Sequence, residues 1–136
     1  MKERRVERVG AGAAVTYLTK SEEFVGASEA AIAARRWNAA GLAAIHAGKS
    51  AADSVLAAVA GVRSRETDHA AVIALLDERV AAFKGANRRQ LVGLLRSKNA
   101  VEYEDRLLTE VEAIQLVDQA RRLYRWASLI VDPTES

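Results

Sequence analysis

Proline, the residue that most often interrupts a helix, occurs once in this 136-residue chain, at position 133. Alanine, which has the highest intrinsic helix propensity, makes up about a fifth of the residues. Val, Ile and Thr never form the sustained alternating run that is typical of a half-buried strand. The sequence therefore predicts an all-α fold, and its length suits one domain with one core.

The composition excludes several kinds of site. The chain has no cysteine, which rules out disulfides and thiolate metal sites. Its two histidines, His46 and His69, are too few for a histidine-based metal cluster, so we expect neither a metal nor a cofactor. The net charge of +2 and the pI of about 9.1 are typical of a mildly basic, solvated surface.

The chain also lacks the marks of membrane insertion or export. No apolar run approaches the ~18 residues of a membrane span. Charged residues within positions 1–8 interrupt any signal-peptide core. We therefore expect a cytoplasmic protein with no membrane partner.

The two ends of the chain differ from its middle. Residues 1–14 are charged and then glycine-rich, which predicts a flexible N-terminal tail, and residues 132–136 predict a C-terminal one. Residues 15–131 are expected to form a single helical-bundle domain.

Apolar periodicity predicts two long helices in the first half of the chain. The first is expected over about 15–35, although Thr19 and Glu22 fit a capping box that would start it near Lys20. The second is expected over about 37–60, and a glycine ends it before a loop. The predicted buried faces are Val15, Leu18, Val25 and Ile32, then Leu42, Ile45, Ala52, Leu56 and Val59.

Three further helices are predicted in the second half. Thr67 or Asp68 can cap a third helix, a short helix follows over about 88–95, and the last helix starts near 101 or 104 and ends at 131. The third helix has the apolar positions Ile73, Leu76, Val80 and Phe83. The last has Leu107, Val111, Ile114, Val117, Ala120, Tyr124, Ala127 and Val131.

Four substantial amphipathic helices with short connections predict an antiparallel up-and-down four-helix bundle. The short helix over 88–95 would be an insertion before the last long helix. Gly41 and Gly48 in the second helix would let neighbouring helices approach closely and would also let a second subunit dock. Because the chain is small and has few large core residues, we expect a homodimer.

The segment Arg96–Tyr103 is the main candidate site, because it is polar and lies between two apolar helices. One interpretation is an anion-binding cluster in which Arg96 and Lys98 meet phosphate, while Asn99 and Tyr103 orient the phosphate or a base. The other is a capped helix junction, held by an ion pair between Lys98 and Glu102 and by a hydrogen bond from the Tyr103 hydroxyl.

A bundle with Arg96 and Tyr103 seven residues apart, just before its last helix, resembles the HEPN family of nucleotide- and RNA-associated domains. The resemblance covers about residues 15–131. It implies a homodimer that binds RNA or a nucleotide and acts with an antitoxin or a nucleotidyltransferase, in a toxin–antitoxin or defence system. The other segments that carry it are Arg35-Arg36 with the small-residue run 37–47, and Gly61 followed by Asp68-His69 and Leu75-Leu76.

The chain departs from the family at one position. Ribonuclease members have an Arg, four to six intervening residues and a His, often with a Tyr two residues beyond, and Arg and His from two subunits form a metal-independent RNA-cleaving site. Arg96 and Tyr103 match the Arg and Tyr, but Val101 stands where the His is expected. A valine cannot carry a proton, and Tyr103 or Lys98 would replace the His only with a strongly depressed pKa. We therefore expect the standard catalysis to be absent.

The secondary candidates are Arg63, His69 and His46. Arg63 and His69 have the Arg-x5-His spacing but lie before the third helix, so we interpret the match as chance. His46 is expected to be packed or at an interface. Trp37 and Trp126 are expected to anchor helix ends in the core or in a dimer seam. The cations Arg121, Arg122 and Arg125 are expected to be solvated or, less simply, to bind RNA phosphates or an acidic partner.

Three functional hypotheses follow. The first is a HEPN-like dimer that binds nucleotide, RNA or a protein partner without catalysis of its own. The second is a metal-independent ribonuclease with an altered site made of Arg96, Lys98, Asn99 and Tyr103. The third is a structural or interaction protein whose polar segment only holds helices together.

Overall fold

The structure is a computed structural model and describes residues 6–10, 12–65 and 69–132. It confirms the all-α class: six helices and one pair of short strands make up the regular structure of the described residues. The elements, in chain order, are β1 (Val6–Arg8), α1 (Gly12–Ala33), α2 (Trp37–Ala60), β2 (Val62–Ser64), α3 (His69–Arg79), α4 (Gly85–Arg96), α5 (Lys98–Tyr103) and α6 (Glu110–Val131).

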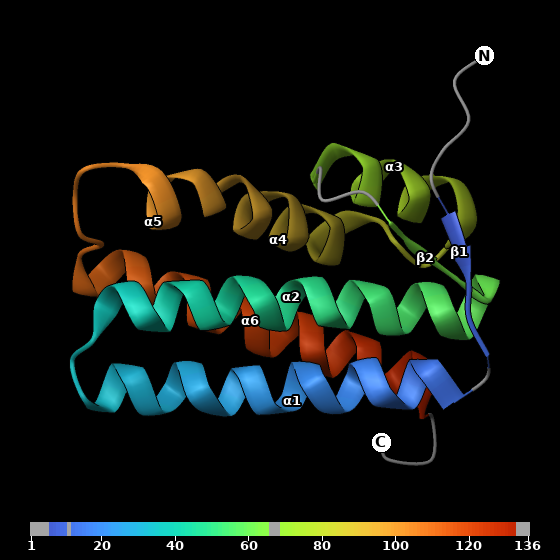
Figure 1. The fold of residues 1–136 in the computed structure, drawn as a ribbon, viewed down its shortest axis with the longest axis horizontal. Helices are drawn as coiled ribbons and strands as arrows, with labels where there is room; N and C mark the ends of the chain where they lie inside the picture. Colours follow the sequence, from blue (N-terminus) through green and yellow to red (C-terminus); the bar gives the residue numbers. More distant parts are fainter. Residues whose placement is uncertain (1–5, 11, 66–68, 133–136) are drawn as a thin grey trace.

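The helices form an antiparallel bundle in which α1, α2 and α6 contact one another (Figure 1). The chain runs along α1, returns along α2, runs back along α4 and α5, and returns again along α6. The third arm of the bundle is therefore α4 with α5, whereas α3 contacts α2 and α4 but not α6. The sequence predicted the reverse, with the helix near residue 70 as an arm and the helix near residue 90 as the insertion. Helix α4 buries Leu91, Leu94 and Leu95 and contacts both α2 and α6, whereas the buried residues of α3 do not bring it to α6.

Helix α2 lies at the centre of the bundle, and its predicted bounds are confirmed. Gly61 ends it in the left-handed conformation, with φ of +64°, which glycine adopts without a steric penalty. Val59, predicted to be buried, is exposed.

The two glycines of α2 accept side chains from the same chain. A Cβ at Gly41 would collide with Leu108, and a Cβ at Gly48 would collide with Leu94. Both glycines are buried in the bundle. Close packing at these positions is confirmed, but other elements of the same chain fill the space in which a second subunit was expected.

Helix α1 starts at Gly12, and Thr19 lies inside it with its hydroxyl donating to the Val15 carbonyl. The predicted capping box and the alternative start near Lys20 are therefore wrong. Val15 is exposed, while Ser21 is fully buried and donates to the Ala47 carbonyl of α2 over 2.8 Å. The buried face of α1 consists of Ala14, Ser21, Val25 and Ser28. Three of these four residues are small, and small residues let α1 lie close to α2.

The N-terminal part of the chain is not simply a tail. Residues 6–8 pair antiparallel with residues 62–64, with Val6 opposite Ser64 and Arg8 opposite Val62. This pairing also replaces part of the predicted loop after α2. Residues 1–5, 11, 66–68 and 133–136 lie outside the described residues, and so do the predicted cap at positions 67 and 68 and most of the C-terminal tail.

The last two predicted boundaries also move. Helix α4 begins at Gly85, where the backbone N–H of Lys84 donates to the Asn87 side chain. Helix α6 begins only at Glu110, behind a capping box made by Thr109 and Glu112. Of the predicted α6 face, Val117, Ala120 and Ala127 are buried, whereas Leu107, Val111 and Ile114 are exposed. Among the described helices none is long and apolar enough to cross a membrane.

Candidate functional site

The main candidate segment folds as the end of α4, one linking residue and the short helix α5. Its side chains border an open pocket of about 300 Å³. We call this the α3–α5 pocket, because α3 supplies one residue and the end of α4 with α5 supplies the others. It is lined by His69, Leu95, Arg96, Lys98, Asn99 and Tyr103. Four of the five primary candidates therefore share one pocket, joined by the secondary candidate His69.

The polar side chains of the α4–α5 segment have little to hold them to the protein. Within the described residues, the side chains of Arg96, Lys98 and Asn99 make no hydrogen bond or ion pair. The predicted ion pair between Lys98 and Glu102 is therefore not formed, and the junction interpretation loses its main contact. Two cations and a carboxamide are left available to a ligand.

Tyr103 is exposed at the edge of this pocket. The neighbouring Glu102 carboxylate raises the pKa of the Tyr103 phenol, first as a hydrogen-bond partner and then as a nearby negative charge. A raised pKa disfavours the phenolate, and the single phenolic proton is donated to Glu102. This direction is opposite to the depressed pKa that a proton-carrying Tyr103 would need.

Val101 faces the bundle core and does not line the α3–α5 pocket. It is only 6% exposed, and its Cγ2 atom lies next to the space above Gly41. A side chain at position 101 therefore points away from Arg96 and Lys98. A histidine there would not join them, whatever the spacing along the chain implies.

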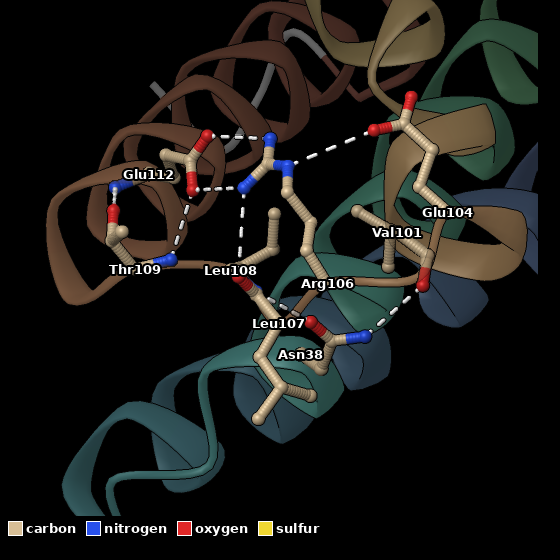
Figure 2. Close-up of polar contacts among 8 residues, drawn as sticks. All are labelled: Asn38, Val101, Glu104, Arg106, Leu107, Leu108, Thr109 and Glu112. Atoms are coloured by element: carbon tan, nitrogen blue, oxygen red, sulfur yellow. Dashed lines mark hydrogen bonds and ion pairs between the residues drawn. The ribbon is translucent and has the colours of Figure 1, made fainter.

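One side chain of α2 fixes the position of α5. The Asn38 amide nitrogen donates to the Val101 carbonyl over 3.0 Å, and its oxygen accepts from the Leu108 N–H over 2.8 Å (Figure 2). These two bonds tie α5, at Val101, and the chain just before α6, at Leu108, to the start of α2. No pattern in the sequence indicated this role for Asn38.

An arginine within the same segment fixes it to the start of α6. Arg106 donates two hydrogen bonds to Glu112, both of 2.9 Å, and its Nε lies 3.6 Å from Glu104 (Figure 2). Arg106 and the Thr109 N–H lower the pKa of Glu112 to about 2. We call residues 104–109, with Asn38 and Glu112, the pinned connection.

The Arg63–His69 pair does not form a site. The Arg63 guanidinium donates to the Tyr17 hydroxyl over 3.0 Å and pairs with Glu7, in a cavity that His69 does not line. His69 instead lies beside Arg96. His46 is exposed and stacks on Phe24 with the ring centroids 5.2 Å apart, so it is not packed in the core.

The remaining candidates serve the bundle or the surface. Arg121 pairs with Glu29 across α1 and α6, and Arg122 pairs with Asp118, so two of the three cations have carboxylate partners. Trp37 and Trp126 are partly buried against the core, as expected of anchors at helix ends. No group of three or more potential metal ligands occurs in the part of the chain that the structure describes.

His69 is the pocket residue that sequence reasoning rejected. It lies 27 positions before Arg96, and nothing in the local pattern indicates that α3 packs beside the end of α4. The capping box that starts α6, in contrast, is visible in the sequence as Thr109-x-x-Glu112. Comparison with protein-family models and with curated proteins finds no match for this chain.

Proposed function

We propose that this helical bundle binds the phosphate groups of RNA or of a nucleotide in the α3–α5 pocket. The observation that carries the proposal is the meeting of Arg96, Lys98 and Asn99 in one open pocket, with no hydrogen bond or ion pair from these side chains within the described residues. Residues of these types, placed together and unpaired, suit an anionic ligand.

Each side chain has a role that its chemistry allows. Arg96 and Lys98 supply positive charge, and the Arg guanidinium can donate two parallel hydrogen bonds to one phosphate. Asn99 can donate to a phosphate oxygen or pair with the edge of a base. The Tyr103 phenol, whose proton goes to Glu102, can accept a hydrogen bond at its oxygen and offers a ring on which a base can stack.

The resemblance to the HEPN family extends the proposal to partners. On this basis we propose a homodimer in the cytoplasm that works with an antitoxin or a nucleotidyltransferase. Leu107, Val111 and Ile114 are exposed apolar side chains near the start of α6, and they offer a surface for the second copy. Light scattering coupled to size exclusion tests this part, and a monomer mass at micromolar concentration contradicts it.

Binding is best tested with a fluorescently labelled single-stranded RNA and, in parallel, with a labelled adenosine nucleotide. The variant Arg96→Gln/Lys98→Gln is expected to weaken RNA binding about tenfold or more and to reduce the slope of affinity against salt. Lys84→Gln/Arg89→Gln is the matched control, because both residues are exposed cations near the start of α4 and lie outside the pocket. Equal losses in the two variants contradict the proposal.

A second candidate function is metal-independent cleavage of RNA, and the position of His69 favours it. His69 shares the pocket with Arg96 and Lys98, so a group that exchanges protons near neutral pH stands beside two cations. In such a reaction His69, as the base, removes the proton of a ribose 2′-OH, whose oxygen attacks the adjacent phosphorus; the bond from phosphorus to the 5′-oxygen breaks, and that oxygen takes a proton from water. The cations would stabilise the charge that develops on the phosphate oxygens.

Incubation of the protein with total RNA in the presence of EDTA tests this candidate. Cleavage by the unmodified chain that is lost in His69→Gln, while RNA binding is retained, supports it. Absence of cleavage by the unmodified chain contradicts the second candidate and leaves the binding proposal standing.

A further inference from the structure

A second cleft, independent of the proposed function, opens between α1 and α2 next to β2. Its volume is about 510 Å³, which lies in the range of small-molecule sites. It shares no lining residue with the α3–α5 pocket. The residues that matter are Tyr17, Lys20 and Phe24 from α1, Ser50 and Asp53 from α2, and Arg63 from β2.

The negative charge inside this cleft is already offset. Asp53 is 8% exposed, and both of its carboxylate oxygens accept from the Lys49 ammonium at 3.0 Å. Burial raises the pKa of Asp53, against the opposing effects of Lys49, Arg63 and Lys20. The Asp53 carboxylate is therefore paired within the protein by Lys49, which leaves Lys20 to other partners.

Several hydrogen-bond donors border the cleft. The Tyr17 oxygen accepts from the Arg63 guanidinium, so the phenolic proton of Tyr17 is left to donate elsewhere. Glu7 holds the Nε of Arg63 at 3.2 Å and so fixes the orientation of the guanidinium. Lys20 lies 5.7 Å from the centre of the Tyr17 ring and makes no ion pair within the described residues.

One wall of the cleft is apolar and aromatic. It consists of Phe24, whose ring is backed by His46, and of Ala27. The exposed carboxylate of Glu23 also borders the cleft and disfavours ligands with a high negative charge. The cleft thus combines a ring-binding wall with donors and cations on one side.

We propose that this cleft binds a small organic monoanion, a carboxylate carried on an aromatic or aliphatic body. The body packs against Phe24, and the carboxylate accepts from the Tyr17 hydroxyl and meets Lys20 and Arg63. Phosphate esters are a poorer fit, because their higher charge is repelled by Glu23.

The test is an NMR titration of the isotope-labelled full chain with benzoate, with neutral benzamide and with inorganic phosphate. Benzoate is expected to give saturable shifts at the backbone amides of Tyr17, Ser50 and Arg63. Benzamide is expected to bind about tenfold more weakly, because it lacks the charge. Shifts of equal size and midpoint for benzamide, tighter binding of phosphate, or no saturation would each overturn the proposal.

Two conservative variants locate the site. Tyr17→Phe removes only the hydroxyl, and Lys20→Gln replaces the ammonium with a shorter neutral side chain; each is expected to weaken benzoate binding about three- to tenfold. Lys84→Gln, at an exposed lysine outside the cleft, is the control and is expected to change nothing. The same spectra report whether each variant is folded. Folded Tyr17→Phe and Lys20→Gln proteins with unchanged benzoate affinity would overturn the assignment.

Discussion

The pinned connection and the α3–α5 pocket contain nearly the same kinds of residue and use them differently. Each has an arginine and an asparagine, and a glutamate lies beside each, Glu112 in the pinned connection and Glu102 next to Tyr103 at the pocket. In the pinned connection, Arg106 binds Glu112 twice and Asn38 bridges two backbone groups. In the pocket, Arg96 and Asn99 make no such contacts within the described residues.

The difference shows that residue type alone does not separate a structural polar cluster from a binding one. What separates them is whether the polar groups satisfy one another. A satisfied cluster stabilises the fold, whereas an unsatisfied one at the surface is solvated and remains available to a ligand. The first cluster also serves the second, because Asn38 holds the chain at Val101, within α5.

The largest expected effect comes from placing a histidine at position 101. Val101→His inserts a larger, polar ring into the core beside Gly41 and should reduce the free energy of unfolding by about 3 kcal/mol. Because the side chain faces the core, the variant should gain no RNA cleavage. Urea denaturation and an RNA cleavage assay check both parts, and a stable, cleaving variant contradicts the assigned orientation of Val101.

A pair of asparagines tests the comparison directly. Asn38→Ala removes two hydrogen bonds and leaves two backbone groups without their partner, so it should reduce the free energy of unfolding by about 2 kcal/mol. Asn99→Ala removes an exposed side chain that makes no hydrogen bond within the described residues, so it should change the free energy of unfolding by less than about 0.5 kcal/mol. Chemical denaturation of both variants decides, and similar losses would abolish the distinction between the two clusters.

A pair of arginines tests the same distinction through binding. Arg96→Gln should weaken the binding of single-stranded RNA about fivefold, since one phosphate contact is lost. Arg106→Gln removes the same charge from the pinned connection and should change affinity less than about twofold. Fluorescence anisotropy at fixed salt measures the RNA affinity of both variants. A larger loss of affinity in Arg106→Gln than in Arg96→Gln would place the RNA at the pinned connection and contradict the proposed site.

The smallest expected effect is a dependence of stability on pH. The pKa of Glu112 in the folded protein, about 2, lies below its ordinary value, so the stabilisation from Glu112 is present above about pH 4.5. It is lost as the pH falls from about 4.5 to 2. Arg106→Gln should raise the pKa of the Glu112 carboxyl toward its ordinary value and flatten this part of the stability profile. Carbon-detected NMR titration of Glu112 gives the pKa in both proteins.

Local sequence signals predicted the fold correctly where the ends of a helix are determined by residues within or next to that helix. Helix α2 is an alanine-rich stretch followed by Gly61, and both its ends were predicted. The β1–β2 pair was not, because strands of three residues separated by a long helical hairpin show no alternating pattern. The start of α6 was predicted too early, because the apolar spacing was followed back to Leu107. The capping box at Thr109 starts the helix at Glu110, and Leu107 is exposed before it.

The candidate site could be predicted only where it is continuous in sequence. Arg96, Lys98, Asn99 and Tyr103 were identified because they lie within eight positions of one another. The approach of His69 and the orientation of Val101 depend on how α3 and α5 pack, which no local pattern encodes. The Tyr17–Arg63 contact, which spans 46 positions, was missed for the same reason.

The short β1–β2 pair closes the α1–α2 hairpin into a ring. The two helices are joined at one end by the turn at residues 34–36, and at the other end residues 6–8 are hydrogen-bonded to residues 62–64. Neither helix can separate from the other by fraying at a free end, so the pair must open as one cooperative unit. Hydrogen exchange should therefore report a shared opening free energy for α1 and α2, and deletion of residues 1–8 should divide it into two.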